Sequence, residues 1–255
     1  MTNLIFCIYL ILLNSSLARV IKVGPGYQYS KIQEAINFSI DGDTIKVLPG
    51  IYTDAIAINK NIVLQGSGYE VTKIITNTHP AVSLIKGKIM WLAISSITGN
   101  GIEVKDGIVT NCVITACGEN GVLFLSGASG SIKNSVIVGN NKYGVIGDYY
   151  TGYAINCIAD GYVGLKGVTY CIGTGGNTNI YSNPNFEGSD NFHLLTSSPG
   201  IDAGNPIEQD PDGSRCDIGY FGGIDCPIFP VVTLIKIIPL DNGQIKIQAT
   251  ANANY

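Results

Sequence analysis

The sequence predicts an all-β solenoid, and two observations point to that fold. A short apolar pattern with an asparagine–glycine or tyrosine–glycine pair at its second and third positions occurs three times. Its copies lie at residues 99–104, 119–124 and 142–147. Between them, Asn111, Asn134 and Asn156 precede short apolar runs and are separated by 23 and 22 residues. A repeat of this length is one structural unit that buries its apolar face against its neighbours, so we expect stacked strands joined by turns.

The first 18 residues have the pattern of an export signal. Residues 4–13 form an unbroken apolar run that is too short to span a bilayer, and small residues around Ala18 suit cleavage after that residue. No lysine or arginine precedes the run, which departs from the usual signal pattern. We expect an extracellular or cell-surface protein with no stable membrane span after cleavage; a retained anchor is the alternative.

One helix is predicted, over residues 29–40. Ser30 and Gln33 have the spacing of a capping box, and apolar residues follow at helical spacing. We expect this amphipathic helix to cover the open end of the strand stack, where unpaired strand edges invite aggregation. Regular rungs are expected over residues 43–176.

The three asparagines of the repeat have a structural explanation. Neighbouring strands lie about 4.8 Å apart, so residues one period apart lie above one another. Asn111, Asn134 and Asn156 should therefore form a ladder in which each side-chain amide bonds to the next. Roughly 130 residues at about 22 per turn give about six rungs and a rod about 30 Å long by the same spacing.

Two parts of the chain resemble known proteins. Residues 41–52 and 62–66 resemble the opening rungs of the pectin-lyase-like superfamily, which includes pectin methylesterases and many secreted polysaccharide-active proteins. This resemblance implies a single-stranded right-handed parallel β-helix over residues 19–227. The residues near its end look like the closing segment of bacterial secreted β-helix proteins of the choice-of-anchor type, which implies export. They lie at residues 192–204, 210–215 and 217–222, within a closing segment that we place at residues 177–227.

Residues 228–255 have a different pattern. Residues 231–238 and 244–250 alternate like two strands, and residues 241–243 suit a turn between them. Two strands alone are not stable in water. We expect the incomplete start of a β-sandwich-like module, and hence a chain that is a fragment of a longer protein.

Composition excludes some functions and weakens others. The net charge is −4 and charged residues make up 13%, which leaves no basic face for nucleic acid. The rungs carry nine lysines against eight acidic residues, and arginine occurs only at Arg19 and Arg215. A pectin-like polyanion would find little positive charge there, and residues 121–127, the nearest match to the catalytic strand of the methylesterases, contain no carboxylate. We assign no catalytic residue.

Tyrosines crowd about one and a half rungs and suggest a sugar-binding surface. Aromatic faces suit the apolar faces of sugar rings, and tyrosine hydroxyls can bond to sugar hydroxyls. The alternative is that they cover strands and turns. The candidate ligand-binding residues are Tyr143, Tyr149, Tyr150, Tyr153, Tyr162 and Tyr170.

These observations favour a non-catalytic module that is glycan-binding or surface-structural and adhesive. Its expected partner is a polysaccharide or cell-surface glycan, and we expect a monomer. The alternative is a polysaccharide lyase or hydrolase that acts on pectin-like uronic-acid polymers. Either function places the protein outside the cell.

Two further features lie in the closing segment. Four aspartates make an oxygen-rich cluster with part of a calcium-loop spacing, so Ca²⁺ is the candidate cation, although the same residues make a good turn. They are Asp202, Asp210, Asp212 and Asp217. No cofactor is expected to be required. Cys216 and Cys226 flank a glycine-rich loop and are the candidate disulfide of an exported chain.

Overall fold

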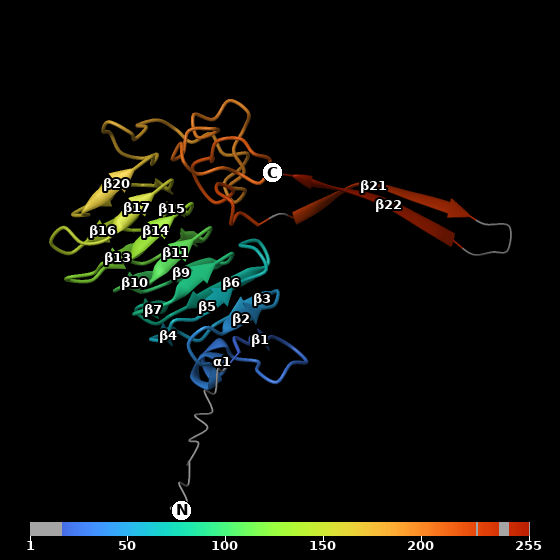
Figure 1. The fold of residues 1–255 in the computed structure, drawn as a ribbon, viewed down its shortest axis with the longest axis horizontal. Helices are drawn as coiled ribbons and strands as arrows, with labels where there is room; N and C mark the ends of the chain where they lie inside the picture. Colours follow the sequence, from blue (N-terminus) through green and yellow to red (C-terminus); the bar gives the residue numbers. More distant parts are fainter. Residues whose placement is uncertain (1–16, 228, 240–244, 255) are drawn as a thin grey trace, which may run out of the picture.

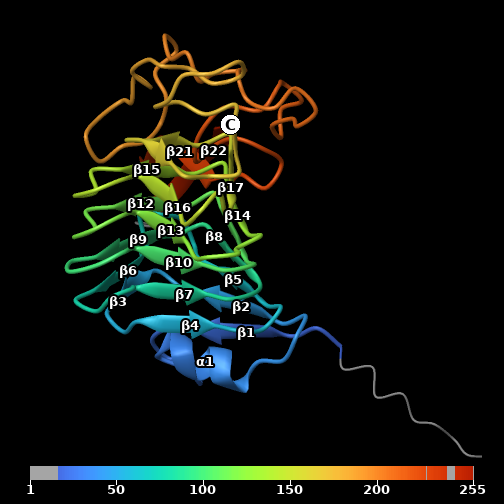
Figure 2. The ribbon, with the colours of Figure 1, turned by 90° about the vertical axis from the view of Figure 1, so that its left-hand side faces the viewer.

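The protein is a parallel β-solenoid in which each coil supplies one strand to each of three sheets in turn (Figures 1 and 2). The computed structural model describes residues 17–227, 229–239 and 245–254. The prediction of an all-β, right-handed parallel β-helix with a short N-terminal helix is confirmed. Two of the three sheets have six strands each, which agrees with the number of rungs expected from the sequence.

Sheet A is the longest of the three, with eight strands, because it begins before the helix. Its strands are β1 (Val20–Val23), β2 (Thr44–Val47), β5 (Val63–Gln65), β8 (Lys88–Met90), β11 (Ile108–Thr110), β14 (Ser131–Lys133), β17 (Tyr153–Ile155) and β20 (Gly167–Thr169). β1 pairs with β2 in parallel, so the sheet starts more than 20 residues before the predicted rungs. A single strand preceding a helix gave no repeat by which the sequence could reveal it.

Sheets B and C complete each coil. Sheet B contains β3 (Gly50–Tyr52), β6 (Thr72–Thr76), β9 (Ala93–Ser96), β12 (Val113–Thr115), β15 (Val136–Val138) and β18 (Ile158–Ala159). Sheet C contains β4 (Ile56–Ile58), β7 (Val82–Leu84), β10 (Ile102–Val104), β13 (Val122–Phe124), β16 (Val145–Gly147) and β19 (Tyr162–Val163). Strand neighbours in both sheets are one coil apart, and all their pairings are parallel.

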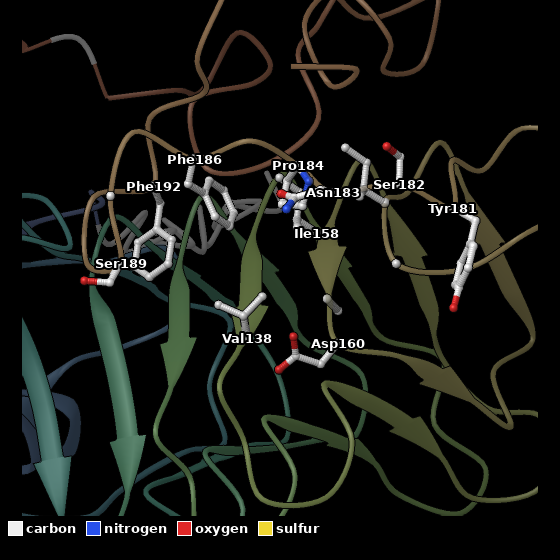
Figure 3. A pocket seen from close by; sticks show the side chains of 14 residues that line it. Val138, Ile158, Asp160, Tyr181, Ser182, Asn183, Pro184, Phe186, Ser189 and Phe192 are labelled. Carbon is white, nitrogen blue, oxygen red and sulfur yellow. The ribbon is translucent and has the colours of Figure 1, made fainter. Parts of the chain in front are cut away.

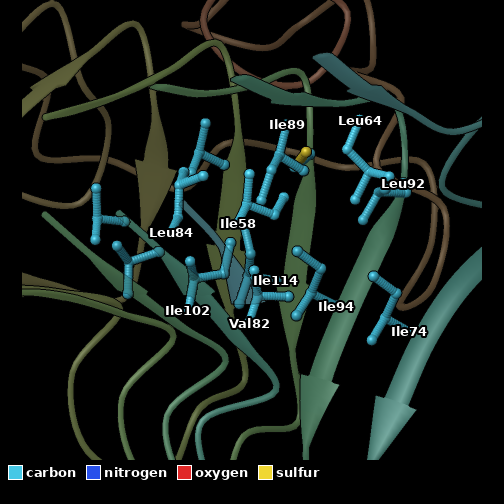
Figure 4. Close-up of a cluster of buried hydrophobic side chains, with 14 of the residues drawn as sticks. Ile58, Leu64, Ile74, Val82, Leu84, Ile89, Leu92, Ile94, Ile102 and Ile114 are labelled. Atoms are coloured by element: carbon cyan, nitrogen blue, oxygen red, sulfur yellow. The ribbon is translucent and has the colours of Figure 1, made fainter. Parts of the chain in front are cut away.

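Apolar side chains from the three sheets meet inside the coils (Figure 4). Alternate residues of a strand face opposite sides of its sheet, so each short strand sends one or two side chains inward. In sheet B the inward row is Ile74, Ile94, Ile114 and Ile137, all essentially inaccessible to solvent. Branched residues at these positions fill a narrow interior and favour strand geometry at the same time.

Helix α1 (Ile32–Phe38) covers the N-terminal end, as expected, but it is shorter than predicted. Its N-cap is Lys31, with no side-chain cap bond, so the predicted capping box of Ser30 and Gln33 is wrong. Gln33 instead pairs with the free edge of β4: its Oε1 accepts the N–H of Ala57 at 2.7 Å. The unpaired backbone of the first strand in sheet C competes successfully for this amide.

The last helical turn is bound by a lysine from the next coil. Lys60 Nζ donates to the carbonyl oxygens of Ile36 at 2.8 Å and Ser39 at 2.6 Å. These groups have no partner within a helix, and a cation at this end also complements the helix dipole. The cap is therefore attached to the solenoid by polar bonds as well as by its buried apolar face.

The corner between sheets A and B contains the three repeat asparagines. All three have left-handed backbone conformations, with φ of 45° at Asn111, 42° at Asn134 and 54° at Asn156, a conformation that asparagine tolerates better than most residues. The predicted ladder forms in part: Asn156 Nδ2 donates to Asn134 Oδ1 at 3.0 Å. Asn111 instead donates to the carbonyl oxygens of Tyr220 at 2.7 Å and Gly222 at 2.9 Å, because the closing segment covers this corner.

A second asparagine pair lies at the start of the repeated pattern, and we did not predict it. Asn120 Nδ2 donates to Asn100 Oδ1 at 2.9 Å, and Asn120 Oδ1 accepts the N–H of Tyr143 at 3.2 Å. Stacked copies of the same motif thus provide hydrogen-bond partners for the polar groups of their own turns. The asparagine–glycine pairs in the sequence were the signal for it.

The closing segment does not simply continue the rungs. Isolated bridges join Ile158, Ile172 and Ile180, but after them the chain folds back along the outside of sheet B. There Tyr69, Phe192 and Tyr220 form a buried cluster in which Tyr69 and Tyr220 have ring centroids 4.7 Å apart. The cluster covers the outward-facing first residues of β12, β15 and β18.

The last two strands form an antiparallel hairpin outside the three sheets. They are β21 (Phe229–Pro239) and β22 (Ile245–Asn254). The predicted strands are therefore present in extended form, and the predicted turn at residues 241–243 lies outside the described residues. Among the described residues, no helix has the length and apolar character needed to cross a membrane.

Candidate functional site

A groove runs across the outer face of sheet B, beside the closing segment. It consists of two adjoining cavities of about 620 and 590 Å³ that share Val138, Ser189 and Phe192. One extends over β15 and β18 toward Tyr181, and the other extends over β12 and β9 to β6. The groove therefore crosses five strands along the solenoid axis, a distance of about 19 Å at about 4.8 Å per spacing.

The floor of the groove is a row of small side chains at equivalent positions of successive strands. Ile75 pairs with Ser95, and Thr115 pairs with Val138. All four face outward into the groove, because the residue before each of them fills the interior. β9 and β12 thus contribute hydroxyl groups, and β6 and β15 contribute alkyl groups. Such a floor is flat and offers both polar and apolar contacts to a bound molecule.

Aromatic and polar residues of the closing segment make one wall (Figure 3). Phe186 and Phe192 lie edge to face with ring centroids 5.2 Å apart, and Phe192 is buried against the sheet. The Phe192 N–H donates to the Tyr69 hydroxyl at 3.2 Å, and the Tyr69 N–H donates to the Tyr220 hydroxyl at 3.2 Å. These bonds fix the wall against β6, β9 and β12, so the groove exists only while the closing segment is docked.

The ionisable groups of the groove are mainly acidic. Glu70, Asp160 and Asp190 line it together with one cation, Lys73. Asp160 Oδ2 accepts the N–H of Gly139 at 2.5 Å, which holds one carboxylate at the edge of the floor. Three acidic side chains against one basic side chain give the groove a net negative charge.

The predicted tyrosine surface is divided among different parts of the solenoid. Tyr149 and Tyr150 are 87% and 79% exposed in the turn that joins sheet C to sheet A, and both have a positive φ. Tyr143 is exposed at the turn that joins sheet B to sheet C. Neither position lines the groove, although the pair at residues 149 and 150 presents two rings to solvent.

The other three candidate tyrosines have structural partners. Tyr162 packs against the core of the last coil and its hydroxyl donates to the carbonyl oxygen of Cys157 at 2.9 Å, which argues against a ligand-binding role. Tyr153 lies on the outer face of sheet A beneath Lys166, whose Nζ is 5.5 Å from the ring centroid. The Tyr170 ring lies 5.9 Å from the Arg215 guanidinium carbon.

Three of the four aspartates of the predicted cation cluster accept hydrogen bonds from neighbouring groups of the loop. Asp210 accepts the N–H groups of Asp217 at 2.9 Å and Gly223 at 2.5 Å, and Asp217 accepts the Asp202 N–H at 2.7 Å. Asp212 accepts the hydroxyl of Ser214 at 2.7 Å. In the part of the chain that the structure describes, no group of three or more acidic, histidine or cysteine side chains is arranged to hold a metal ion. The carboxylates therefore shape the loop.

This loop makes stability depend on pH. Burial, together with the carboxylates of Asp210 and Asp202, raises the pKa of Asp217 to about 6. A carboxyl group whose pKa is higher in the folded than in the unfolded chain stabilises the fold fully below about pH 4, its usual pKa range, and this stabilisation is lost as pH rises through 6. Asn would keep the oxygen that accepts the Asp202 N–H.

Asp217→Asn should therefore raise Tm by about 2 °C at pH 7 and have little effect at pH 4. The expected increase is small because the Asp217 side chain is partly exposed and solvent screens its charge. Thermal unfolding of both proteins between pH 4 and 8 measures this. A Tm difference that does not change with pH would contradict the prediction.

The predicted disulfide is absent from the structure. Cys216 and Cys226 are both buried free thiols, and burial raises the pKa of Cys226 to about 12. The Asn156 side chain donates to Cys216 Sγ at 3.4 Å, because the loop turns this thiol toward the asparagine corner. Flanking a loop in sequence was an insufficient criterion, since the direction of each side chain decides whether two cysteines can bond.

Both arginines of the chain are used structurally. Arg215 donates to the carbonyl oxygens of Gly204 and Ala203, and Arg19 binds Asp43. Two lysines of the rungs are also bound: Lys105 donates to the Ser126 carbonyl oxygen, and Lys142 pairs with Glu119. Among the described residues that line the groove, Lys73 is the one cationic side chain.

The similarity of this chain to known proteins is limited. No protein-family model matches the chain. A cell surface glycoprotein of Methanothermus fervidus is 30% identical over 131 residues, which are 50% of this chain and 19% of that protein, so the chain spans about a fifth of its length. Pectin methylesterase PemA from Erwinia chrysanthemi has a TM-score of 0.39 and 10% identity over 61% of this chain and 54% of that one. Pectate lyase Pel9A has a TM-score of 0.33 and 13% identity over 82% of this chain and 97% of that one.

Proposed function

We propose that this chain is a secreted or surface-displayed glycan-binding module and that the groove on sheet B holds a neutral sugar chain. The observation that carries the proposal is the continuous groove itself, with hydroxyl groups in its floor and aromatic side chains in its wall. Sugar rings present apolar faces and hydroxyl edges, and protein sites for them combine aromatic contacts with a few polar groups.

The shape and the charge of the groove each support part of the proposal. A groove that crosses five strands suits an extended chain better than one compact molecule. Its excess of acidic side chains disfavours uronic-acid polymers, which were the substrates of the alternative enzymatic function. The similarity to a protein named as a cell surface glycoprotein supports a location at the cell surface.

Blocking the floor of the groove should abolish binding. Ser95 lies in the middle of the floor on β9, and Ser95→Trp would fill the space between Thr115 and Ile75. We expect at least a tenfold loss of retention on the polysaccharides that the unaltered protein binds, because the chain can no longer lie along sheet B. The measurement is a panel of neutral and acidic polysaccharides, scored for binding and for new reducing or unsaturated ends.

The chain offers a matched control. Ser83 is the middle residue of β7 and faces outward from sheet C, so Ser83→Trp makes the same change on a different face. Tyr149→Ala with Tyr150→Ala tests the exposed tyrosine pair on the same panel. Equal binding by the Ser95 and Ser83 variants would exclude the groove, loss in the tyrosine variant alone would move the site to that turn, and new chain ends would show an enzyme.

A further inference from the structure

The N-terminal end of the solenoid contains a buried carboxylate with an unusual set of partners. The Asp43 side chain is inaccessible to solvent. Its Oδ2 accepts the Ile40 N–H at 2.9 Å and the Arg19 Nη2–H at 2.7 Å, and its Oδ1 accepts the backbone N–H of Arg19 at 2.9 Å. Asp43 thus binds both the side chain and the main-chain nitrogen of the same residue.

The position of that nitrogen is fixed from both sides. The Thr44 N–H donates to the Arg19 carbonyl oxygen at 2.8 Å, and β1 continues from Val20 in register with β2. The Arg19 guanidinium lies over the Phe38 ring, 4.9 Å from its centroid. The nitrogen of Arg19 is therefore held against Asp43 by strand pairing and by the helix, independently of the residues before it.

The peptide bond that precedes this nitrogen is open to solvent. Leu17 and Ala18 are both exposed, with Leu17 at 82%. In the sequence, small residues occupy positions 16 and 18 after an apolar run, which is the pattern a leader peptidase recognises. The accessible bond and the sequence pattern coincide at the residue whose nitrogen contacts the buried carboxylate.

We propose that the Ala18–Arg19 bond is a proteolytic processing site and that the α-ammonium group released on Arg19 binds Asp43. A leader peptidase hydrolyses the bond with one water: Ala18 receives the carboxylate oxygen, and the nitrogen of Arg19 becomes an amine that takes up a proton. The amide N–H that donates to Asp43 is thereby replaced by a cation at the same position. Charge-assisted bonds are shorter and stronger than those of neutral donors, so processing strengthens the closure of the first coil.

The proposal predicts a specific pH dependence. An α-amino group has a pKa of about 7.7 to 8.0 in an unfolded chain, and contact with Asp43 raises it. The added stability is therefore full below about pH 7.7 and is lost as pH rises through the higher pKa of the folded chain. The other titratable groups that face this position are the Arg19 guanidinium and Tyr29.

The test compares chains that differ only at this end. A protein beginning at Arg19 with a free amine should have a Tm about 3 °C or more above that of the same chain with an acetylated amine at pH 6, and the difference should vanish near pH 10. Equal Tm values at pH 6 would overturn the proposal. Adding Ala18 back to the free-amine chain should remove the advantage, because the charge then lies one residue away.

Two further measurements keep the test decisive. In the Asp43→Asn background the free and acetylated chains should have the same Tm; if that variant does not fold, the acylation rate of the α-amine in the Arg19-start protein replaces it. We expect this rate to be at least tenfold lower at pH 7 in the folded than in the unfolded protein. Finally, N-terminal sequencing of the full chain after expression in a secreting host should give Arg19, and any other first residue overturns the processing site.

Discussion

Replacing Asn111 by alanine should lower the free energy of unfolding by about 3 kcal/mol and Tm by about 8 °C. The side-chain amide of Asn111 is fully buried and donates to the carbonyl oxygens of Tyr220 and Gly222. Alanine leaves both oxygens without these bonds, and each buried unsatisfied group costs about 1 to 3 kcal/mol. Alanine also tolerates the positive φ of this position poorly.

Glycine at position 111 separates the two causes. It adopts a positive φ without strain, so Asn111→Gly should recover about 1 kcal/mol while the loss of hydrogen bonds remains. If alanine and glycine have equal effects, backbone strain contributes nothing. A Tm within 2 °C of the unaltered protein for both variants would show that the closing segment does not depend on this amide.

The consequence for function follows from the position of the closing segment. Asn111 binds residues 220 and 222, and Tyr220 packs on Tyr69, which in turn bonds to Phe192 in the wall of the groove. Loosening this chain of contacts should expose residues 177–227 to limited proteolysis, and should weaken the glycan binding that we propose, before the coils themselves unfold. Binding that survives cleavage of the closing segment would show that the wall is not needed.

The regular coils could be predicted from the sequence because their determinants are local and repeated. The 22 to 23 residue spacing of Asn111, Asn134 and Asn156 reflects turns that recur in each coil, and the corner positions indeed share a left-handed backbone. The short apolar runs that follow Asn111 and Asn134 supply the inward-facing Ile114 and Ile137 of sheet B. Where the signal occurred once, prediction failed: β1 was missed, and the capping role assigned to Gln33 was wrong because a strand edge, far away in sequence, takes its amide.

The groove could not be predicted because it depends on contacts between distant residues. Tyr69 and Tyr220 are separated by 151 residues, and neither belongs to the repeat. Sequence spacing identified a dense group of tyrosines between residues 143 and 170, but the turns of a solenoid point in different directions, so density in sequence did not become a surface. The small outward residues Ser95 and Thr115 were a usable signal only once sheet B and the path of the closing segment were known.

Phe124 should be the most sensitive position of the interior. It is the buried phenylalanine of the main core, and in sheet C it stacks between Val104 on one coil and Gly147 on the next. A Cβ added to Gly152 would lie 2.2 Å from the Phe124 ring. Position 152 therefore has no room for a side chain, because the ring occupies that space. One large side chain therefore fills the space beside Gly147 and Gly152, neither of which has a side chain.

Phe124→Ala should lower the free energy of unfolding by about 4 kcal/mol, since removal of a buried phenyl ring leaves a cavity that glycines cannot fill. Phe124→Leu, which retains most of the volume, should cost about 1 kcal/mol. Leu123→Ala is the matched control, because Leu123 is next in sequence on the same strand but faces outward. Urea unfolding gives the three values, and a Phe124→Ala cost no larger than that of Leu123→Ala would contradict close packing here.

The same variant tests how far a defect spreads. In a solenoid each coil contacts only its neighbours, so lost packing should first increase amide hydrogen exchange in the strands next to β13, namely β10 and β16. Thr115, a floor residue of the groove, lies on β12 in the same coil as Phe124. Phe124→Ala should therefore weaken binding at the proposed groove only under conditions in which amide hydrogen exchange at β12 has also increased. Such a result would link the packing of the interior to the proposed binding surface.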